Sequence, residues 1–269
     1  MTAKCRQLLR PQSPYADRML SPAAVIFDLD GTLVDDASAS DLALRSVISE
    51  YPEISRLDFQ IVREEWRRDF AKLWRPVAMG EVSVLENRVI RFGNIFGAAD
   101  QNLPREEAVE MSLRYDEIYL SGMKRIPGAL ELIYELKSLG CRMGILTNHS
   151  YEYQKNKLAK AGYPEFYGFF VSPEQVRAMK PERRIFEAAL ERCNAPPSSV
   201  VMIGDSFADD VVGASNAGIN PIWFNRFGVS RPTVDFDFRE LTSYLPLDRA
   251  LAVITSTRGN RNSAHAKFS

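Results

Sequence analysis

Short apolar runs that each end in polar residues are the clearest pattern along the chain. Three such runs occupy residues 23–27, 142–146 and 200–204, and two weaker ones occupy 168–171 and 221–224. The runs are continuous rather than alternating, which is typical of strands that are covered on both faces. The pattern therefore predicts five strands of a buried sheet.

Segments with the apolar spacing of helices lie between these runs. Residues 128–139 are followed by Gly140, and residues 181–193 begin with Pro181, which are common signals for the end and the start of a helix. Alternating strands and helices predict right-handed βαβ units and a parallel sheet. In such a sheet the polar residues that follow the strands meet at one edge, where ligands bind.

The stretch between the first two predicted strands has a different character. Residues 36–125 contain no strand-like run. Helical patterns dominate them, over 41–50, 57–73, 82–96 and 105–120. A segment of this length is too long for a simple crossover. It predicts an inserted helical cap domain, joined to the rest by linkers near 34–39 and 123–127.

These patterns divide the chain into an extension, a core, an inserted cap and a tail. The predicted core comprises residues 23–35 and 126–256, and the predicted cap comprises 36–125. Residues 1–22 form an N-terminal extension, and the polar residues 257–269 are expected to be disordered. The predicted fold class is α/β, a doubly wound, Rossmann-like parallel sheet with an α-helical cap.

Composition narrows the range of functions. Of the 269 residues, 45% are hydrophobic and 26% are charged, which excludes a disordered chain, a collagen and a coiled-coil rod. A net charge of -1 gives no general attraction to nucleic acid or to an anionic membrane. The three cysteines show no CxxC spacing, and no apolar run approaches the ~18 residues of a membrane helix. We expect a cytoplasmic protein that binds neither nucleic acid nor membranes.

Carboxylates gather where two of the predicted strands end. Asp28 and Asp30 follow the first run, and Asp205 follows the run at 200–204, with Asp209 and Asp210 shortly after it. Carboxylates at one edge of a sheet repel one another unless a cation compensates them. Oxygen ligands without histidine or cysteine favour a hard ion, and Mg²⁺ is the usual one beside phosphate.

Groups suited to phosphate oxygens are expected at the same edge. Thr147 offers a hydroxyl, Asn148 an amide and Lys180 a positive charge. Carboxylates, a metal ion, hydrogen-bond donors and a lysine are the parts that phosphoryl transfer requires.

Four short motifs, in this order, resemble those of the haloacid dehalogenase-like superfamily of hydrolases. They are Asp28-x-Asp30-Gly31-Thr32, Thr147-Asn148, Lys180-Pro181 and Gly204-Asp205-Ser206-x-x-Asp209-Asp210. The resemblance covers roughly residues 25–224, and the helical insert after the first motif is similar to that of the helical-capped phosphatase subgroup.

The resemblance implies a role for each acid of the first motif. Asp28 would be the nucleophile that forms an aspartyl-phosphate, and Asp30 the general acid and then the general base. Mg²⁺ would be held by Asp28, by the backbone carbonyl of Asp30 and by Asp205.

The resemblance also implies a phosphate-binding set, comprising Thr147, Asn148 and Lys180. Asp209 and Asp210 compete for the role of the second acid of the fourth motif. We favour Asp210, because the Val-Val-Gly-Ala that follows it is similar to the family's usual continuation.

The aromatic and basic residues of the predicted cap are candidates for contacts with the substrate. They are Arg63, Trp66, Arg67, Arg68, Trp74, Arg75, Arg88 and Arg91. The favoured interpretation is an amphipathic array of core tryptophans and solvated arginines. We nevertheless expect one or two of these residues to touch the substrate, because the cap must cover the catalytic face.

The resemblance favours a Mg²⁺-dependent phosphatase acting on a small phosphomonoester, such as a nucleoside monophosphate or a sugar phosphate. A phosphomutase shares all four motifs, and only product analysis separates the two activities. A haloacid dehalogenase needs neither Asp30 nor the metal carboxylates, and a non-catalytic binding protein would have no need of Asp28 and Asp205. The substrate and the oligomeric state are left open.

Overall fold

The computed structural model describes residues 21–164 and 168–256. The predicted tail, 257–269, and all but the last two residues of the predicted extension, 1–22, lie outside the described residues. Within the described part, no helix combines the length and the apolar character that crossing a membrane would require.

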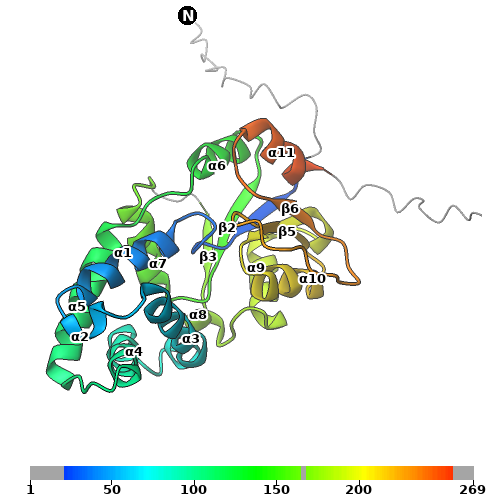
Figure 1. Cartoon of the computed structure of the whole chain (residues 1–269). Coiled ribbons are helices and arrows are strands. Elements are labelled where there is room, and N and C mark those ends of the chain that lie inside the picture. Colours follow the sequence, from blue (N-terminus) through cyan, green and yellow to red (C-terminus); the bar gives the residue numbers. More distant parts are fainter. Residues whose placement is uncertain (1–20, 165–167, 257–269) are drawn as a thin grey trace, which may run out of the picture.

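Six parallel strands form one sheet in the order β3-β2-β1-β4-β5-β6 (Figure 1). They are β1 (Ala24–Phe27), β2 (Arg142–Leu146), β3 (Phe169–Val171), β4 (Val200–Gly204), β5 (Asn220–Phe224) and β6 (Arg239–Leu241). The five predicted strands are present, with bounds that differ by at most one residue. The sixth was not predicted, because this short edge strand carries Arg239 and Glu240 and forms no apolar run.

Helices cover both faces of the sheet, which confirms the doubly wound α/β fold. On one face, α9 (Arg183–Cys193) and α10 (Gly213–Asn216) pack against Ala24 and Ile26 of β1. On the other face, α6 (Ala129–Ser138), α7 (Tyr151–Lys160) and α11 (Leu247–Thr255) pack with Val25 and Phe27. The alternation of side chains along a strand explains why all four residues of β1 are buried.

The short elements are α8 (Pro173–Val176), a 3-10 turn (Pro197–Ser199) and a π-helical turn, η2 (Phe207–Val212).

The segment between β1 and α6 is helical in the structure (Figure 1). It contains α1 (Asp36–Ile48), α2 (Pro52–Ser55), α3 (Phe59–Ala78), α4 (Val84–Ala98) and α5 (Arg105–Ser121). We call α1–α5 the helical insert. Its buried side chains, such as Phe92 and Tyr115, join the same apolar cluster as Val25 and Phe27 of the sheet. The division of the chain into domains at 36 and 125 stays a prediction.

Two helices of the insert, α1 and α3, extend well beyond their predicted bounds. Helix α1 starts at Asp36 rather than at residue 41, because the Asp35 carboxylate caps it by accepting from the Ser38 N–H at 3.2 Å. Helix α3 runs through Pro76 to Ala78 rather than ending at residue 73. Its last turns pack Trp74 and Ala78 against a small apolar cluster, and this burial offsets the cost of an internal proline.

The two chain segments that connect the insert to the sheet pair with each other. The Asp35 N–H donates to the Lys124 carbonyl, and the Ile126 N–H donates to the Leu33 carbonyl, both at 2.9 Å. Because the first of these segments comes directly after β1, this pairing holds the insert at the carboxyl end of the sheet.

Candidate active site

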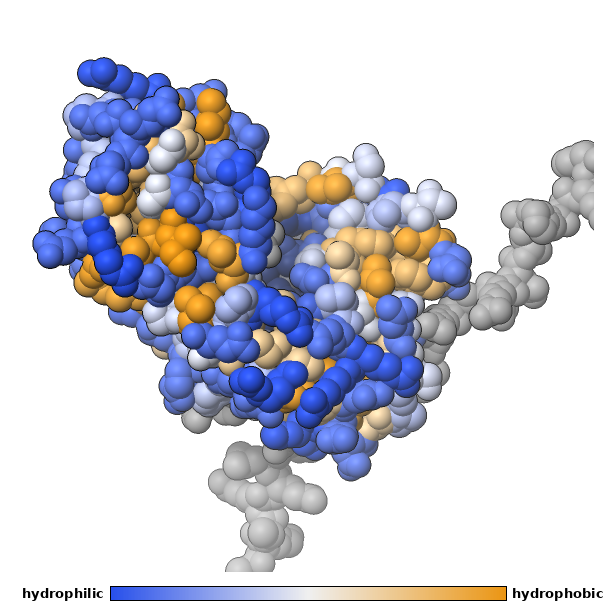
Figure 2. Space-filling view, turned by 90° about the horizontal axis from the view of Figure 1, so that it is seen from below, coloured by the Kyte–Doolittle hydropathy of each residue, from blue (hydrophilic) through white to orange (hydrophobic). Residues whose placement is uncertain are grey.

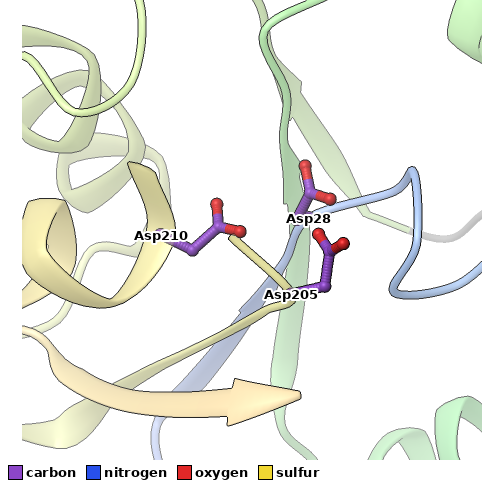
Figure 3. A group of neighbouring side chains, drawn as sticks. All are labelled: Asp28, Asp205 and Asp210. Carbon is purple, nitrogen blue, oxygen red and sulfur yellow. The ribbon is translucent and has the colours of Figure 1, made fainter. Parts of the chain in front are cut away.

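Three carboxylates meet at the carboxyl edge of the sheet, and their side chains point toward one another (Figure 3). Asp28 follows β1 and Asp205 follows β4, while Asp210 comes from η2. One oxygen from each lies within 4.8 Å of those of the other two. Strands β1 and β4 are neighbours at the point where the order of strands reverses, which is where such sheets bind ligands.

The π-helical turn η2 gives the adjacent acids Asp209 and Asp210 different positions. Asp210 is 1% exposed, and its Oδ2 accepts from the Ser206 N–H at 3.0 Å. Asp209 contributes its own backbone N–H to the Ser206 hydroxyl at 3.2 Å, and its carboxylate is not part of the three-carboxylate cluster. Single π-turns are common at functional sites. Here the turn directs only the second acid of the pair inward.

Lys180 supplies one positive charge to this cluster. Its Nζ donates to Oδ1 of Asp28 at 2.6 Å and to Oδ1 of Asp210 at 2.7 Å, and the residue is 3% exposed. Burial raises the pKa of Asp28 to about 7, although Lys180 opposes the shift. Burial, together with Asp28 and Asp210, also raises the pKa of Asp205 well above its usual value. One lysine is therefore insufficient compensation for three clustered carboxylates, two of which are buried.

The chemistry of this donor set fits a hard divalent cation. All three groups offer carboxylate oxygens, and the surplus negative charge would be relieved by a metal ion. Two glycines keep the cluster compact. A Cβ on Gly31, whose φ is +75°, would lie 2.3 Å from Asp205 Oδ2, and a Cβ on Gly204 would lie 2.2 Å from the Asp210 carboxylate.

The Asp30 carboxylate contacts helix α7 instead of the other three acids. Lys157 Nζ lies 2.8 and 2.9 Å from its two oxygens, and Gln154 Nε2 donates to Oδ2 at 2.9 Å. Both partners are buried. They were missed as site residues, although their spacing of three residues places them on one face of α7. The nearby carboxylate of Asp36 was also missed, and burial followed by Asp30 raises its pKa to about 7.

The second and third motifs are joined by hydrogen bonds. Thr147 Oγ1 accepts from Gln154 Nε2 at 2.7 Å, which leaves the hydroxyl proton free to donate. Asn148 Oδ1 accepts from the Lys180 N–H at 2.7 Å, and Asn148 Nδ2 donates to the Lys180 carbonyl at 3.0 Å. The Asn148 side chain therefore positions Lys180, and its backbone N–H is the group that could donate to a phosphoryl oxygen.

A cavity of about 670 Å³ opens above the carboxylates and is lined by both the core and the helical insert. The surface is hollowed between these two parts in Figure 2. Trp74 of α3 reaches the core, where its Nε1 donates to the Asn148 carbonyl at 2.8 Å. Its ring lies 4.6 Å from that of His149, which in turn stacks on Tyr153 at 4.4 Å. Burial, and then Lys157 and Arg88, lower the pKa of His149 well below its usual value, so the ring is neutral.

A second contact between insert and core consists of hydrogen bonds from an ion pair of the insert to a tyrosine of the core. Arg88 of α4 pairs with Asp116 of α5 at 2.6 Å, and both hydrogen-bond to the Tyr153 hydroxyl of α7. Because Arg88 is 6% exposed, its charge depends on these partners.

Several known proteins are similar to this chain in sequence. Residues 22–218 match a family model described as haloacid dehalogenase-like hydrolase. Glyceraldehyde 3-phosphate phosphatase from Methanothermobacter thermautotrophicus is 29% identical over 75% of this chain and 85% of its own length. Phosphoglycolate phosphatase from Caulobacter vibrioides is 29% identical over 88% of this chain and 92% of its own length.

The fold is also similar to that of a solved structure. A magnesium-bound HAD-hydrolase from Bacillus subtilis has a TM-score of 0.69 against 87% of this chain and 100% of its own, at 22% identity. At that level of identity the likeness establishes a shared fold.

Proposed function

The chain belongs to the haloacid dehalogenase-like hydrolase family, as its four motifs predicted, and we propose that it is a Mg²⁺-dependent phosphatase. Its substrate is a small phosphomonoester, such as a sugar phosphate or a nucleoside monophosphate, and it acts in the cytoplasm. Relatives that align with most of the chain are named phosphatases of small phosphorylated metabolites.

The observation that carries the proposal is the position of Asp28 at the base of the cavity. Its carboxylate is fixed by Lys180 at 2.6 Å and is close to Asp205 and Asp210. A carboxylate held in this way can attack a phosphorus atom without first losing a proton to a separate base. Lys180 and the Thr147 hydroxyl would stabilise the phosphoryl oxygens.

In the first step an Asp28 oxygen forms a bond to phosphorus while the bond from phosphorus to the leaving oxygen breaks. Asp30 gives its proton to that oxygen, so the products are an alcohol and an aspartyl-phosphate. In the second step Asp30 takes a proton from water, whose oxygen attacks phosphorus. The bond to Asp28 then breaks and inorganic phosphate leaves.

Two further sets of residues support these steps. Lys157 and Gln154 hold the Asp30 carboxylate in place, and Asp210 holds Lys180. Asp28, Asp205 and the Asp30 carbonyl would hold Mg²⁺. When bound, the ion supplies positive charge that offsets the charge of the carboxylates and of the phosphoryl group.

The residues of the site disfavour a haloacid dehalogenase, whereas a phosphomutase is distinguished only by its product. A dehalogenase has no use for a proton donor such as Asp30 or for a cluster of metal-binding carboxylates. A phosphomutase would return the phosphoryl group to a sugar, so the appearance of inorganic phosphate from a sugar phosphate distinguishes the two.

The proposal is tested by trapping the intermediate in an Asp30→Asn variant. Asparagine cannot act as a general acid or base, a contribution worth about 10²–10⁴-fold. With p-nitrophenyl phosphate, whose leaving group needs little protonation, the first step survives better than the second. We expect a burst of nitrophenol and a mass increase of one phosphoryl group on Asp28. The same added mass on another residue, or turnover that persists in excess chelator, would overturn the proposal.

A further inference from the structure

The cavity has two ends of opposite charge. Its carboxylates come from the ends of β1 and β4, from η2 and from the start of α1. They are Asp28, Asp30, Asp36, Asp205, Asp209 and Asp210. Its four arginines all come from helices α3 and α4 of the insert, and they are Arg67, Arg75, Arg88 and Arg91. A substrate in this cavity therefore has its phosphoryl group among the acids and its far end among the arginines.

The four arginines differ in how their charges are compensated. Arg75 pairs with Glu182 at 2.7 Å, and Arg88 pairs with Asp116 at 2.6 Å. Arg67 is exposed, so water solvates its charge. Arg91 is 5% exposed and forms no ion pair with a carboxylate among the residues that the structure describes.

The contacts of Arg91 are to neutral groups. Its Nη2 and Nε donate to the Trp66 carbonyl at 2.7 and 3.2 Å, and its Nη1 reaches Asn87 Oδ1 at 3.5 Å. The guanidinium lies over the Trp66 ring, 3.4 Å from its centroid. Three of the five N–H groups are used in this way, which leaves two for a ligand. The negative charge of Asp69 favours the charged form of Arg91 without a direct contact. The Asp69 carboxylate accepts a hydrogen bond from Asn94 Nδ2 at 3.0 Å instead.

A buried cation without an anionic partner is costly. Burial lowers the pKa of Arg91 to about 9, and the neighbouring charge of Arg88 adds to this effect. Contacts with a carbonyl and an aromatic ring offset only part of the cost. An anionic ligand that entered the cavity would offset the rest, and a planar guanidinium is well suited to binding one through two parallel hydrogen bonds.

We propose that Arg91 binds a second anionic group of the substrate, at the end remote from the scissile phosphoryl group. The preferred substrates are then phosphate esters that also carry a carboxylate or a second phosphoryl group. This inference rests on the proposed phosphatase activity and assigns the substrate class of the same site. It separates substrates such as phosphoglycolate from neutral-ended ones such as glyceraldehyde 3-phosphate.

The test compares pairs of substrates that differ in one group. 3-Phosphoglycerate and glycerol 3-phosphate differ in a carboxylate against a hydroxymethyl group. Fructose 1,6-bisphosphate and fructose 6-phosphate test a second phosphoryl group. In the wild-type protein with Mg²⁺, we expect kcat/KM to favour the more anionic member of at least one pair by about tenfold or more. The pair that shows the preference identifies the anionic group.

Variants then assign the preference to Arg91. Arg91→Gln should reduce the kcat/KM ratio within the preferred pair to near one, mainly through a higher KM for the anionic member. Arg91→Met fills the space over Trp66 if the glutamine variant does not fold, and thermal denaturation checks folding of both. The matched control is Arg105→Gln, because Arg105 is an arginine of the insert outside the cavity, in a surface ion pair with Glu86. The control should retain the wild-type ratio.

The outcomes separate this inference from the function on which it rests. If the protein releases no phosphate from any ester, including p-nitrophenyl phosphate, the phosphatase proposal is wrong. If it hydrolyses p-nitrophenyl phosphate but does not favour the anionic member of either pair, only the Arg91 proposal is overturned. It is also overturned if a folded Arg91 variant keeps the wild-type preference, because Arg91 would then serve only to tie α4 to α3.

Discussion

The two walls of the cavity are built in different ways. On the core side, Asp28 and Asp205 each come directly after a strand, and the pairing of β1 with β4 brings them together. On the insert side, Trp74 and Arg91 come from the interiors of helices, and their place depends on how those helices pack. The comparison teaches that sheet topology positions the core side of the cavity, whereas helix packing positions its insert side.

This difference also appears in the electrostatics of the two walls. The core side concentrates negative charge that a metal ion and a lysine must compensate. The insert side carries positive charge that is matched by Asp116 at Arg88, whereas no carboxylate of the described residues forms an ion pair with Arg91. We therefore expect substitutions on the core side to affect all substrates and substitutions on the insert side to affect some of them.

The largest effect is expected from Asp28→Asn. Loss of the proposed nucleophile should lower kcat by at least about 10⁴-fold for every substrate, because the phosphoryl-enzyme could no longer form on this carboxylate. Thermal stability without Mg²⁺ should be unchanged or higher, because the substitution removes one of three clustered carboxylates. Phosphate release and thermal denaturation measure the two effects. Residual activity that varies between substrates would break the comparison, because the core would then contribute to selectivity.

A smaller effect is expected from Asp210→Asn. Lys180 would lose one of its two carboxylate partners, and kcat/KM should fall by about 10–100-fold, as for other hydrogen bonds to charged groups. Asp209→Asn is the matched control, because its carboxylate is not in the cluster, and it should change kcat/KM much less. Steady-state kinetics on the purified variants measures kcat/KM for both. The reverse order would mean that Asp209 is the second acid of the fourth motif.

A stability effect is expected from Tyr153→Phe, where α7 of the core contacts the insert. Arg88 and Asp116 would both lose a hydrogen bond to the hydroxyl, which should lower the free energy of unfolding by about 1–2 kcal/mol. Tyr134→Phe on α6 is the control, because that side chain is 48% exposed. Urea denaturation measures the difference. Equal stability of the two variants would show that this contact between insert and core contributes little.

The smallest effect concerns pH. The pKa of Asp28 is raised from 3.8 to about 7 mainly by burial, so the folded metal-free protein binds more protons than the unfolded chain between these pH values. The associated stability is present below about pH 4 and is lost as the pH rises through about 7. The melting temperature in chelator should therefore fall by a few degrees over this range, and the stabilisation by Mg²⁺ should be greater at pH 8 than at pH 6. Asp28→Asn should have a shallower slope, and an unchanged slope would contradict the assignment to Asp28.

Much of the core could be predicted from the sequence because its signals are local. Five of the six strands and the principal helices follow from runs of apolar residues. The short edge strand β6 gave no such signal, since its burial depends on β5 and on α11. Helix α11 was not singled out, although its buried residues have helical spacing.

The pairing of the acids could be predicted only in part. Asp28 and Asp205 were expected together because parallel strands end at one edge. The contact of Asp30 with Lys157 spans 127 residues of sequence and depends on which face of α7 is turned toward the sheet. Asp209 and Asp210 are adjacent and chemically identical; the resemblance favoured Asp210, and the π-helical turn is the feature that directs its carboxylate to the cluster.

The sequence by itself determined the family, the parallel sheet, the helical insert and the acids that directly follow β1 and β4, because each depends on the order of residues over a short span. Tertiary structure alone decided which charges are compensated. Arg75, Arg88 and Arg91 are indistinguishable as arginines on amphipathic helices. Yet Arg75 is paired at the surface, Arg88 is paired in the interior, and Arg91 is buried with no carboxylate partner in the described part of the chain. The physical reason is that the cost of a charge depends on its burial and its partners, and both are properties of the packed chain.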